Sequence, residues 1–152
     1  NLKMLKNFKV IELISSKTKA LLTVYHNKLK FNVYTAPDLN YAPYVQLLMD
    51  PNGKCFAIMA CDKDAPNAVP FSRPADAKPY PIVVRVPAAI NQICTTMGWN
   101  DKTKYHTIPG QLFYDDKAIV FNLKDADEFT ITPRNAATAD ATDDEESKSD
   151  DE

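Results

Sequence analysis

Apolar and polar residues alternate over Leu29–Tyr34, and this period of two predicts a half-buried strand. Two apolar runs follow, Tyr44–Met49 and Lys54–Ala60, separated by Asp50-Pro51-Asn52-Gly53. A proline at the second position of a turn and a glycine suited to a positive φ predict a tight hairpin between the two runs. The first half of the chain therefore reads as a strand, a short connection and a hairpin.

The same order of elements recurs in the second half of the chain. Ile82–Val86 is a short apolar run that predicts a strand. Pro87–Met97 predicts a helix, because proline suits a first helical turn and apolar residues recur at helical spacing. Gly98 is suited to cap the end of that helix. Tyr105–Tyr114 and Ala118–Leu123 then predict a second hairpin.

Two segments interrupt this pattern. Ser15–Lys19 is polar and reads as a break before a strand at Ala20–Tyr25. Residues 63–81 are rich in proline, which predicts a crossing segment between the halves, with Val69–Phe71 as a short edge strand. Rigid connections and short strands are thus expected throughout.

The domain organisation follows from these elements. We predict one β-rich α+β domain at residues 1–134, with halves at about 20–62 and 82–131 on either side of the crossing. Apolar residues are lost after Ile131, so residues 135–152 are expected to form a disordered tail.

The order of strand, short helix and hairpin resembles the swapped-hairpin, AbrB-like fold of transcription regulators. Arg85-Val86-Pro87 matches the family's strand end and helix start, and Met97-Gly98 stands at its Leu-Gly pair. The first half departs from the pattern, because no glycine follows Leu39, and the helix from Pro87 is longer than the family's single turn. Over residues 29–123 the resemblance implies two halves interlocked as an intrachain pseudo-dimer, with arginines near the first strands contacting duplex DNA.

Charge is distributed unevenly along the chain. The formal net charge of −2 comes from 18 basic and 20 acidic residues. Residues 140–152 contain eight acidic residues and one lysine, which leaves 17 basic and 12 acidic residues, a net charge of +5, in residues 1–139. A basic body with an acidic tail favours a nucleic-acid partner, with the tail modulating its binding.

The candidate phosphate contacts are five basic residues. These candidates are Lys17, Lys19, Lys28, Lys30 and Arg85. Five aromatic residues are interleaved with the basic stretch, and those that are exposed could stack on bases: Phe8, Tyr25, Tyr34, Tyr41 and Tyr44. The alternative is that the lysines form a solvated face and the aromatic residues belong to the core.

No pattern of catalytic or metal-ligating residues is recognisable, so we predict a protein that is not an enzyme and needs no cofactor or metal. His26 and His106 stand in no ligand-spacing motif, and the three glycines of the chain cannot form a phosphate-binding loop. The three cysteines, Cys55, Cys61 and Cys94, lie in apolar runs and are expected to be reduced thiols that fill the core. Because the chain lacks the roughly 20-residue apolar run of a membrane helix, we expect a cytoplasmic protein without a membrane partner.

Three interpretations stay open at this point. The leading one is a non-enzymatic nucleic-acid-binding protein, with duplex DNA favoured by the resemblance. The second is a small protein of phage or accessory-genome type that acts on a protein partner through its acidic tail or an edge strand. The third is a single-stranded nucleic-acid-binding protein with an OB-like barrel, and an unrelated β-rich domain with two chance hairpins is the alternative to internal duplication.

Overall fold

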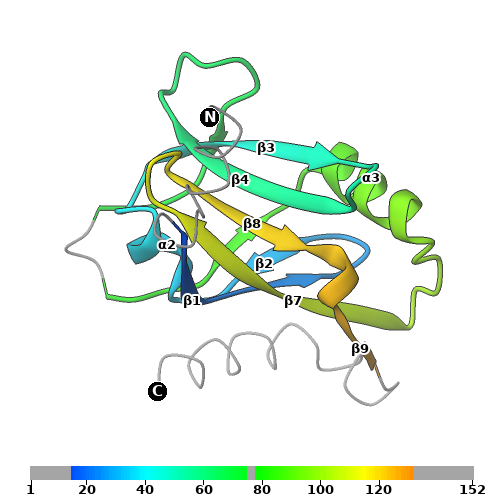
Figure 1. The fold of residues 1–152 in the computed structure, drawn as a ribbon. Helices are drawn as coiled ribbons and strands as arrows, with labels where there is room; N and C mark the ends of the chain where they lie inside the picture. The colour runs from blue at the N-terminus through cyan, green and yellow to red at the C-terminus, as the bar shows by residue number, and fades with distance from the viewer. Residues whose placement is uncertain (1–14, 75–77, 132–152) are drawn as a thin grey trace, which may run out of the picture.

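A curled antiparallel sheet forms the frame of the molecule, which is described here by a computed structural model covering residues 15–74 and 78–131 (Figure 1). The predicted tail at 135–152 lies outside these residues. The elements are β1 (Ser15–Val24), β2 (Leu29–Phe31), α2 (Thr35–Asp38), β3 (Tyr44–Asp50), β4 (Cys55–Cys61), β5 (Val69–Pro70), β6 (Ile82–Val84), α3 (Pro87–Met97), β7 (Lys104–Phe113), β8 (Ala118–Asn122), the 3-10 turn η1 (Leu123–Asp125) and β9 (Asp127–Thr130).

The strands follow the order β5-β3-β4-β8-β7-β1-β2-β6. β9 pairs with the first residues of β7, Lys104 to Thr107. Both predicted hairpins, β3–β4 and β7–β8, are present and lie side by side through the β4–β8 pairing. The first strands of the two halves, β2 and β6, also pair with each other. The predicted strand-rich fold with few helices is therefore confirmed for the described residues. None of the helices in these ranges is long and apolar enough to cross a membrane.

The core lies inside the curl of the sheet. Phe31 is at its centre, with its ring 5.3 Å from that of Phe71 and 5.9 Å from that of Phe121. Phe31 and Phe121 have no exposed surface. Complete burial of such a side chain contributes about 1.5–3 kcal/mol to the stability of the fold. The alternating apolar positions of distant strands thus meet in one packed interior.

β2 is more deeply buried than its sequence predicts. The alternation of the sequence predicts one solvent-facing side, yet Lys30 has only 6% of its surface exposed. β2 lies between β1 and β6, so the Lys30 side chain has a cross-strand neighbour on each side of its own face, Thr23 and Val83. The prediction of a half-buried strand is wrong for this element.

In the first hairpin turn, the residue with a positive φ is not the predicted one. The positive φ falls on Lys54, at 57°, and not on Gly53. Gly53 instead donates its backbone N–H to the Asp50 carboxylate at 3.0 Å, and a Cβ there would lie 2.5 Å from that carboxylate. A larger residue here therefore needs the exposed Asp50 side chain to move aside, and neither the contact nor the backbone angle makes glycine obligatory.

The helix at Pro87–Met97 follows its sequence signals. Pro87 lies in its first turn, and Gly98 ends it with a φ of 71°. Ile90 and Ile93 are buried against the sheet. Helix start, buried face and cap are all confirmed.

The start of β1 and the whole of β9 were not predicted. Ser15–Lys19 reads as a polar break, yet β1 begins at Ser15 and pairs with the end of β7, Ser15 opposite Phe113. A register shift between Lys17 and Leu21 accommodates the polar segment. Long-range pairing with β7 therefore overrides the local polarity, and the predicted break is wrong.

Candidate nucleic-acid interface

One cross-strand row on the outside of the sheet combines cations and aromatic rings. Its five residues come from or adjoin five neighbouring strands. We call these five residues, Arg85, Lys28, Tyr25, Tyr105 and Phe129, the outer row.

The strand registers place these residues in line. Tyr105 pairs with Phe129 across β7 and β9. The backbone N–H of Tyr25 donates to the carbonyl oxygen of Lys28 at 3.0 Å, in the turn between β1 and β2. Lys28 and Arg85 each lie one position beyond the Leu29–Val84 pair that ends the β2–β6 ladder. At about 4.8 Å per strand, the row spans about 19 Å.

The aromatic part of the outer row is a column of stacked rings. The ring centroids are 5.2 Å apart between Tyr25 and Tyr105 and 5.3 Å apart between Tyr105 and Phe129. The interplanar angles of 26° and 21° mean that the rings stand nearly parallel. Phe129 is 44% exposed, and no other described ring stacks on it. The column thus ends in an accessible aromatic face.

The other end of the outer row is cationic. The Lys28 ammonium lies 4.8 Å from the centroid of the Tyr25 ring, a cation–π contact. Arg85 is exposed just after β6. Lys30 is one row further along β2, paired with Thr23 and Val83. The fold therefore brings together three of the five predicted phosphate contacts, although Lys28 and Lys30 are only 9% and 6% exposed. Of the three, Arg85 is the cation most accessible to a phosphate.

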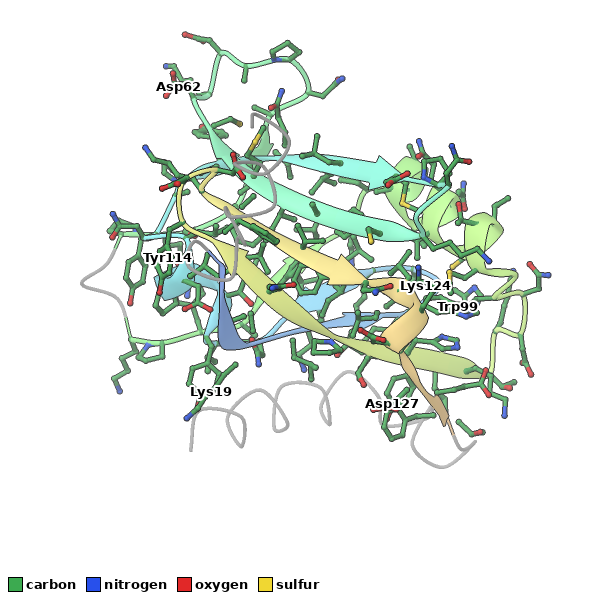
Figure 2. The ribbon with its side chains drawn as sticks, viewed as in Figure 1. Lys19, Asp62, Trp99, Tyr114, Lys124 and Asp127 are labelled. Atoms are coloured by element: carbon green, nitrogen blue, oxygen red, sulfur yellow. The ribbon has the colours of Figure 1, made fainter. Side chains whose placement is uncertain are left out.

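The two remaining predicted contacts lie at the other end of β1. The backbone of Lys17 pairs with that of Gln111. Lys19 is exposed, with its ammonium 5.5 Å from the centroid of the Tyr34 ring. Figure 2 shows Lys19 near one end of the β1–β7 pair and Asp127 of β9 near the other. Lys17 and Lys19 are therefore not part of the outer row.

A buried histidine supports the aromatic column from the inner side. His106 follows Tyr105 in β7 and is 5% exposed. Its ring stacks on Trp99, with centroids 3.7 Å apart, and its Nε2 lies 3.2 Å from a carboxylate oxygen of Glu128 in β9. Burial lowers the pKa of His106 below its ordinary value of 6.5, and the Glu128 carboxylate only partly opposes this effect. The contact therefore joins β9, which carries Phe129, to a neutral imidazole.

Acidic groups gather near the aromatic end of the outer row. Asp127 and Glu128 precede Phe129 in β9 and are exposed. Asp101 accepts hydrogen bonds from the hydroxyl and backbone N–H of Thr103, at 2.6 and 2.9 Å, and these bonds lower the pKa of its carboxyl. The outer row is thus positive at Arg85 and negative around Phe129.

The cysteines do not have the environment of nucleophiles. All three are free, but Cys55 and Cys61 are half-buried on the face of β4 opposite Phe56 and Ile58, so the prediction that they fill the core is wrong. Burial, with a smaller contribution from the neighbouring Asp62 carboxylate, raises the pKa of Cys61. Burial also raises the pKa of Cys94, so these two thiols stay protonated near neutral pH. Among the described residues, no three His, Cys, Asp or Glu side chains are grouped so that they could hold a metal ion.

Sequence reasoning identified Tyr25 but missed Tyr105 and Phe129. The available signal was alternation in β7, where Tyr105 and Thr107 fall on one face and the buried His106 on the other. Nothing in the sequence of β9 indicates that Phe129 lies beside Tyr105. No protein-family model matches the chain, and neither the curated proteins nor the solved structures compared with it include a significant match.

Proposed function

We propose that the chain is a non-enzymatic nucleic-acid-binding protein that holds an unpaired stretch of nucleic acid along the outer row. The observation that carries this proposal is the stacked column Tyr25–Tyr105–Phe129, accessible at Phe129 and bounded by cations at its other end. A base stacked on Phe129 continues the column, and the rest of the strand follows the outer row so that a phosphate of another nucleotide lies near Arg85. Stacking on aromatic side chains and neutralisation of phosphates by basic ones are the two main contributions to single-strand binding.

The geometry of the column favours an unpaired base over a base pair. The parallel rings use their faces on one another, so a new stacking partner is added at the Phe129 end. A base within a duplex already has stacking partners on both sides. An unpaired base is free to occupy this position without breaking a duplex stack.

Replacing Phe129 tests the proposal. Phe129→Ala is expected to lower the affinity for a fluorescein-labelled oligothymidine roughly tenfold, because stacking on one aromatic residue contributes about 1–3 kcal/mol. Tyr114→Ala is the matched control, since Tyr114 is 60% exposed but follows the opposite end of β7. Anisotropy titrations at two salt concentrations measure both. Equal effects of the two variants, or no binding of the oligothymidine by the unmodified chain, would contradict the proposal.

Arg85 tests the electrostatic part in the same titrations. Arg85→Ala is expected to weaken binding and to reduce the slope of log affinity against log salt by about 0.7, as the loss of one single-strand phosphate contact predicts. Lys63→Ala is the control, because Lys63 is exposed in the loop after β4. An unchanged slope would remove Arg85 from the interface.

A second candidate function is duplex DNA binding by an AbrB-like intrachain pseudo-dimer, and the strand registers favour it. The β2–β6 ladder is centred on Lys30–Val83 and the β4–β8 ladder on Ala57–Val120, so each pairs equivalent strands of the two halves. In this arrangement Arg85 belongs to a DNA-contacting surface.

Further equivalences support the pseudo-dimer. The positive-φ residues Lys54 and Lys117 end the two hairpin turns and are as far apart in sequence as Ala57 and Val120. β1 pairs with the hairpin of the second half, and β5 pairs with the hairpin of the first. The two candidate functions differ in their response to Phe129→Ala, which lowers single-strand affinity in the first and leaves duplex affinity unchanged in the second.

The acidic tail is proposed to modulate either activity. Its eight carboxylates in residues 140–152 carry charge opposite to that of the body. Tethered carboxylates compete with phosphates for the same cations, and salt screens this competition. The tail then lowers the affinity for nucleic acid most strongly at low ionic strength.

A further inference from the structure

β3 presents an open edge along most of its length. β5 covers only its first two residues, with Tyr44 opposite Pro70 and Val45 opposite Val69. In Figure 1, β3 lies at the upper border of the sheet, with α3 behind its far end. No strand in the described ranges pairs with this side of residues 46–50.

The backbone groups on this side belong to alternate residues. The carbonyl oxygen of Pro43 accepts a hydrogen bond from the backbone N–H of Phe71 at 2.7 Å. Since strand residues direct their N–H and C=O groups to alternate sides, those of Leu47 and Met49 point to the same open side as Pro43. In the described part of the chain, no backbone hydrogen bond is found for these groups on that side. Unpaired backbone groups of half-buried residues favour the addition of a strand.

A cleft of about 470 Å³ runs beside this edge. Leu47 and Met49 form one wall, Val86 and Ala89 at the start of α3 form the other, and Phe56 also lines it. None of its described lining residues is charged, and Asn67 and Gln92 contribute amides. An occupant with apolar side chains at alternate positions and a free backbone fits this chemistry.

We propose that this cleft binds residues 8–14 of a second copy of the chain as an additional strand of the sheet. Residues 8–14 read Phe-Lys-Val-Ile-Glu-Leu-Ile, with apolar residues at five of seven positions. In an antiparallel register, Leu13 is opposite Leu47 and Ile11 is opposite Met49. Lys9 then lies at the Asp50 end of β3, where Asp50, Lys54 and Lys124 are the charged side chains at the neighbouring turn. This interaction is independent of the proposed function.

The position of Ser15 indicates a second copy instead of the same chain. Ser15 is opposite Phe113 of β7, and Ala118 and Met59 continue that row to Gln46 of β3. This row covers four strand spacings, about 19 Å around the outside of the sheet. Crossing it takes about six extended residues, which uses most of residues 8–14 before the cleft is reached. The segment is therefore too close to its own β1 to fill its own cleft.

Cross-linking of the full chain tests the occupant and its origin together. A mixture of unlabelled and ¹⁵N-labelled protein is treated with an amine cross-linker and analysed by mass spectrometry. The proposed register brings Lys9 near Lys54, in the turn after β3, and predicts Lys9–Lys54 links in which one peptide is light and the other heavy. Links found only within one isotope would assign the segment to its own chain, and an absence of such links would also overturn the proposal.

Paired variants test the cleft itself. Ile11→Asp and Gln92→Glu each place a charge in the interface and are expected to lower the dimer association constant at least about tenfold, measured by light scattering. Asn7→Asp and Asn91→Glu are the controls, because they add the same charge outside residues 8–14 and outside the cleft lining. A monomer at all concentrations, or equal effects of variants and controls, would contradict the proposal.

Discussion

At the scale of single residues, Gly110 shows how closely the sheet packs on its core. A Cβ at this position would lie 2.7 Å from Cγ2 of Ile119 and 2.9 Å from Cε1 of Phe121. Both neighbours are completely buried and have no room to move away. The glycine is needed because Gly110 pairs with Phe121 of β8 at a point where the neighbouring side chains leave no space for a Cβ.

Gly110→Ala is therefore expected to lower the free energy of unfolding by about 1–3 kcal/mol, the usual cost of overpacking a core. Gly98→Ala separates this effect from backbone strain, because a Cβ there meets no atom within 4 Å while φ is 71°. Its cost is about 1–2 kcal/mol, from the left-handed backbone alone. Denaturant unfolding measures both, and a neutral Gly110→Ala variant would contradict the close packing of β7 on β8.

At the scale of elements, β9 is held to β7 partly through His106. Glu128 of β9 approaches the imidazole from one side, Trp99 stacks on it, and His26 and Lys104 are the other charged or titratable groups that act on it. Burial lowers the pKa of His106, so the folded protein binds this proton less readily than the unfolded chain. Stability from the neutral imidazole is present above about pH 6.5 and is lost as the pH falls through the folded pKa.

The unfolding free energy is thus expected to fall between neutral pH and pH values below the ordinary histidine pKa. His106→Gln should show a smaller fall over the same interval, because the unfolded chain no longer gains that proton. His26→Gln is the comparison: it removes the other imidazole, which contributes less than burial to the lowered pKa of His106, and should leave most of the fall in place. Urea unfolding followed by Trp99 fluorescence provides the measurement, and identical pH slopes for the unmodified chain and His106→Gln would contradict the assignment.

The elements differ in how much of them the sequence reveals. The hairpins β3–β4 and β7–β8 and the helix α3 are predictable because alternation, turn residues and caps are local signals. The start of β1 is not, because the polar Ser15–Lys19 segment is extended only through its pairing with β7. The outer row cannot be predicted from the sequence either, because Tyr25, Tyr105 and Phe129 are brought together by pairing between strands that are distant in the sequence.

At the scale of the whole molecule, the outer row and the cleft beside β3 use different residues but adjoin at one point, because Arg85 of the row is followed directly by Val86 of the cleft lining. The outer row crosses β6, β2, β1, β7 and β9, whereas the cleft lies between β3 and the start of α3, the helix that follows β6. The proposed nucleic-acid binding and the proposed strand addition therefore use different residues.

The most direct test of the nucleic-acid interface is ultraviolet cross-linking of the full chain to oligothymidine, followed by mass spectrometry of the cross-linked peptides. We expect the cross-links to fall on peptides that contain Tyr25, Tyr105 or Phe129. Deleting residues 135–152 should raise the yield of these cross-links at low salt and leave the cross-linked positions unchanged. Cross-links confined to other strands, or none in either form, would contradict the account.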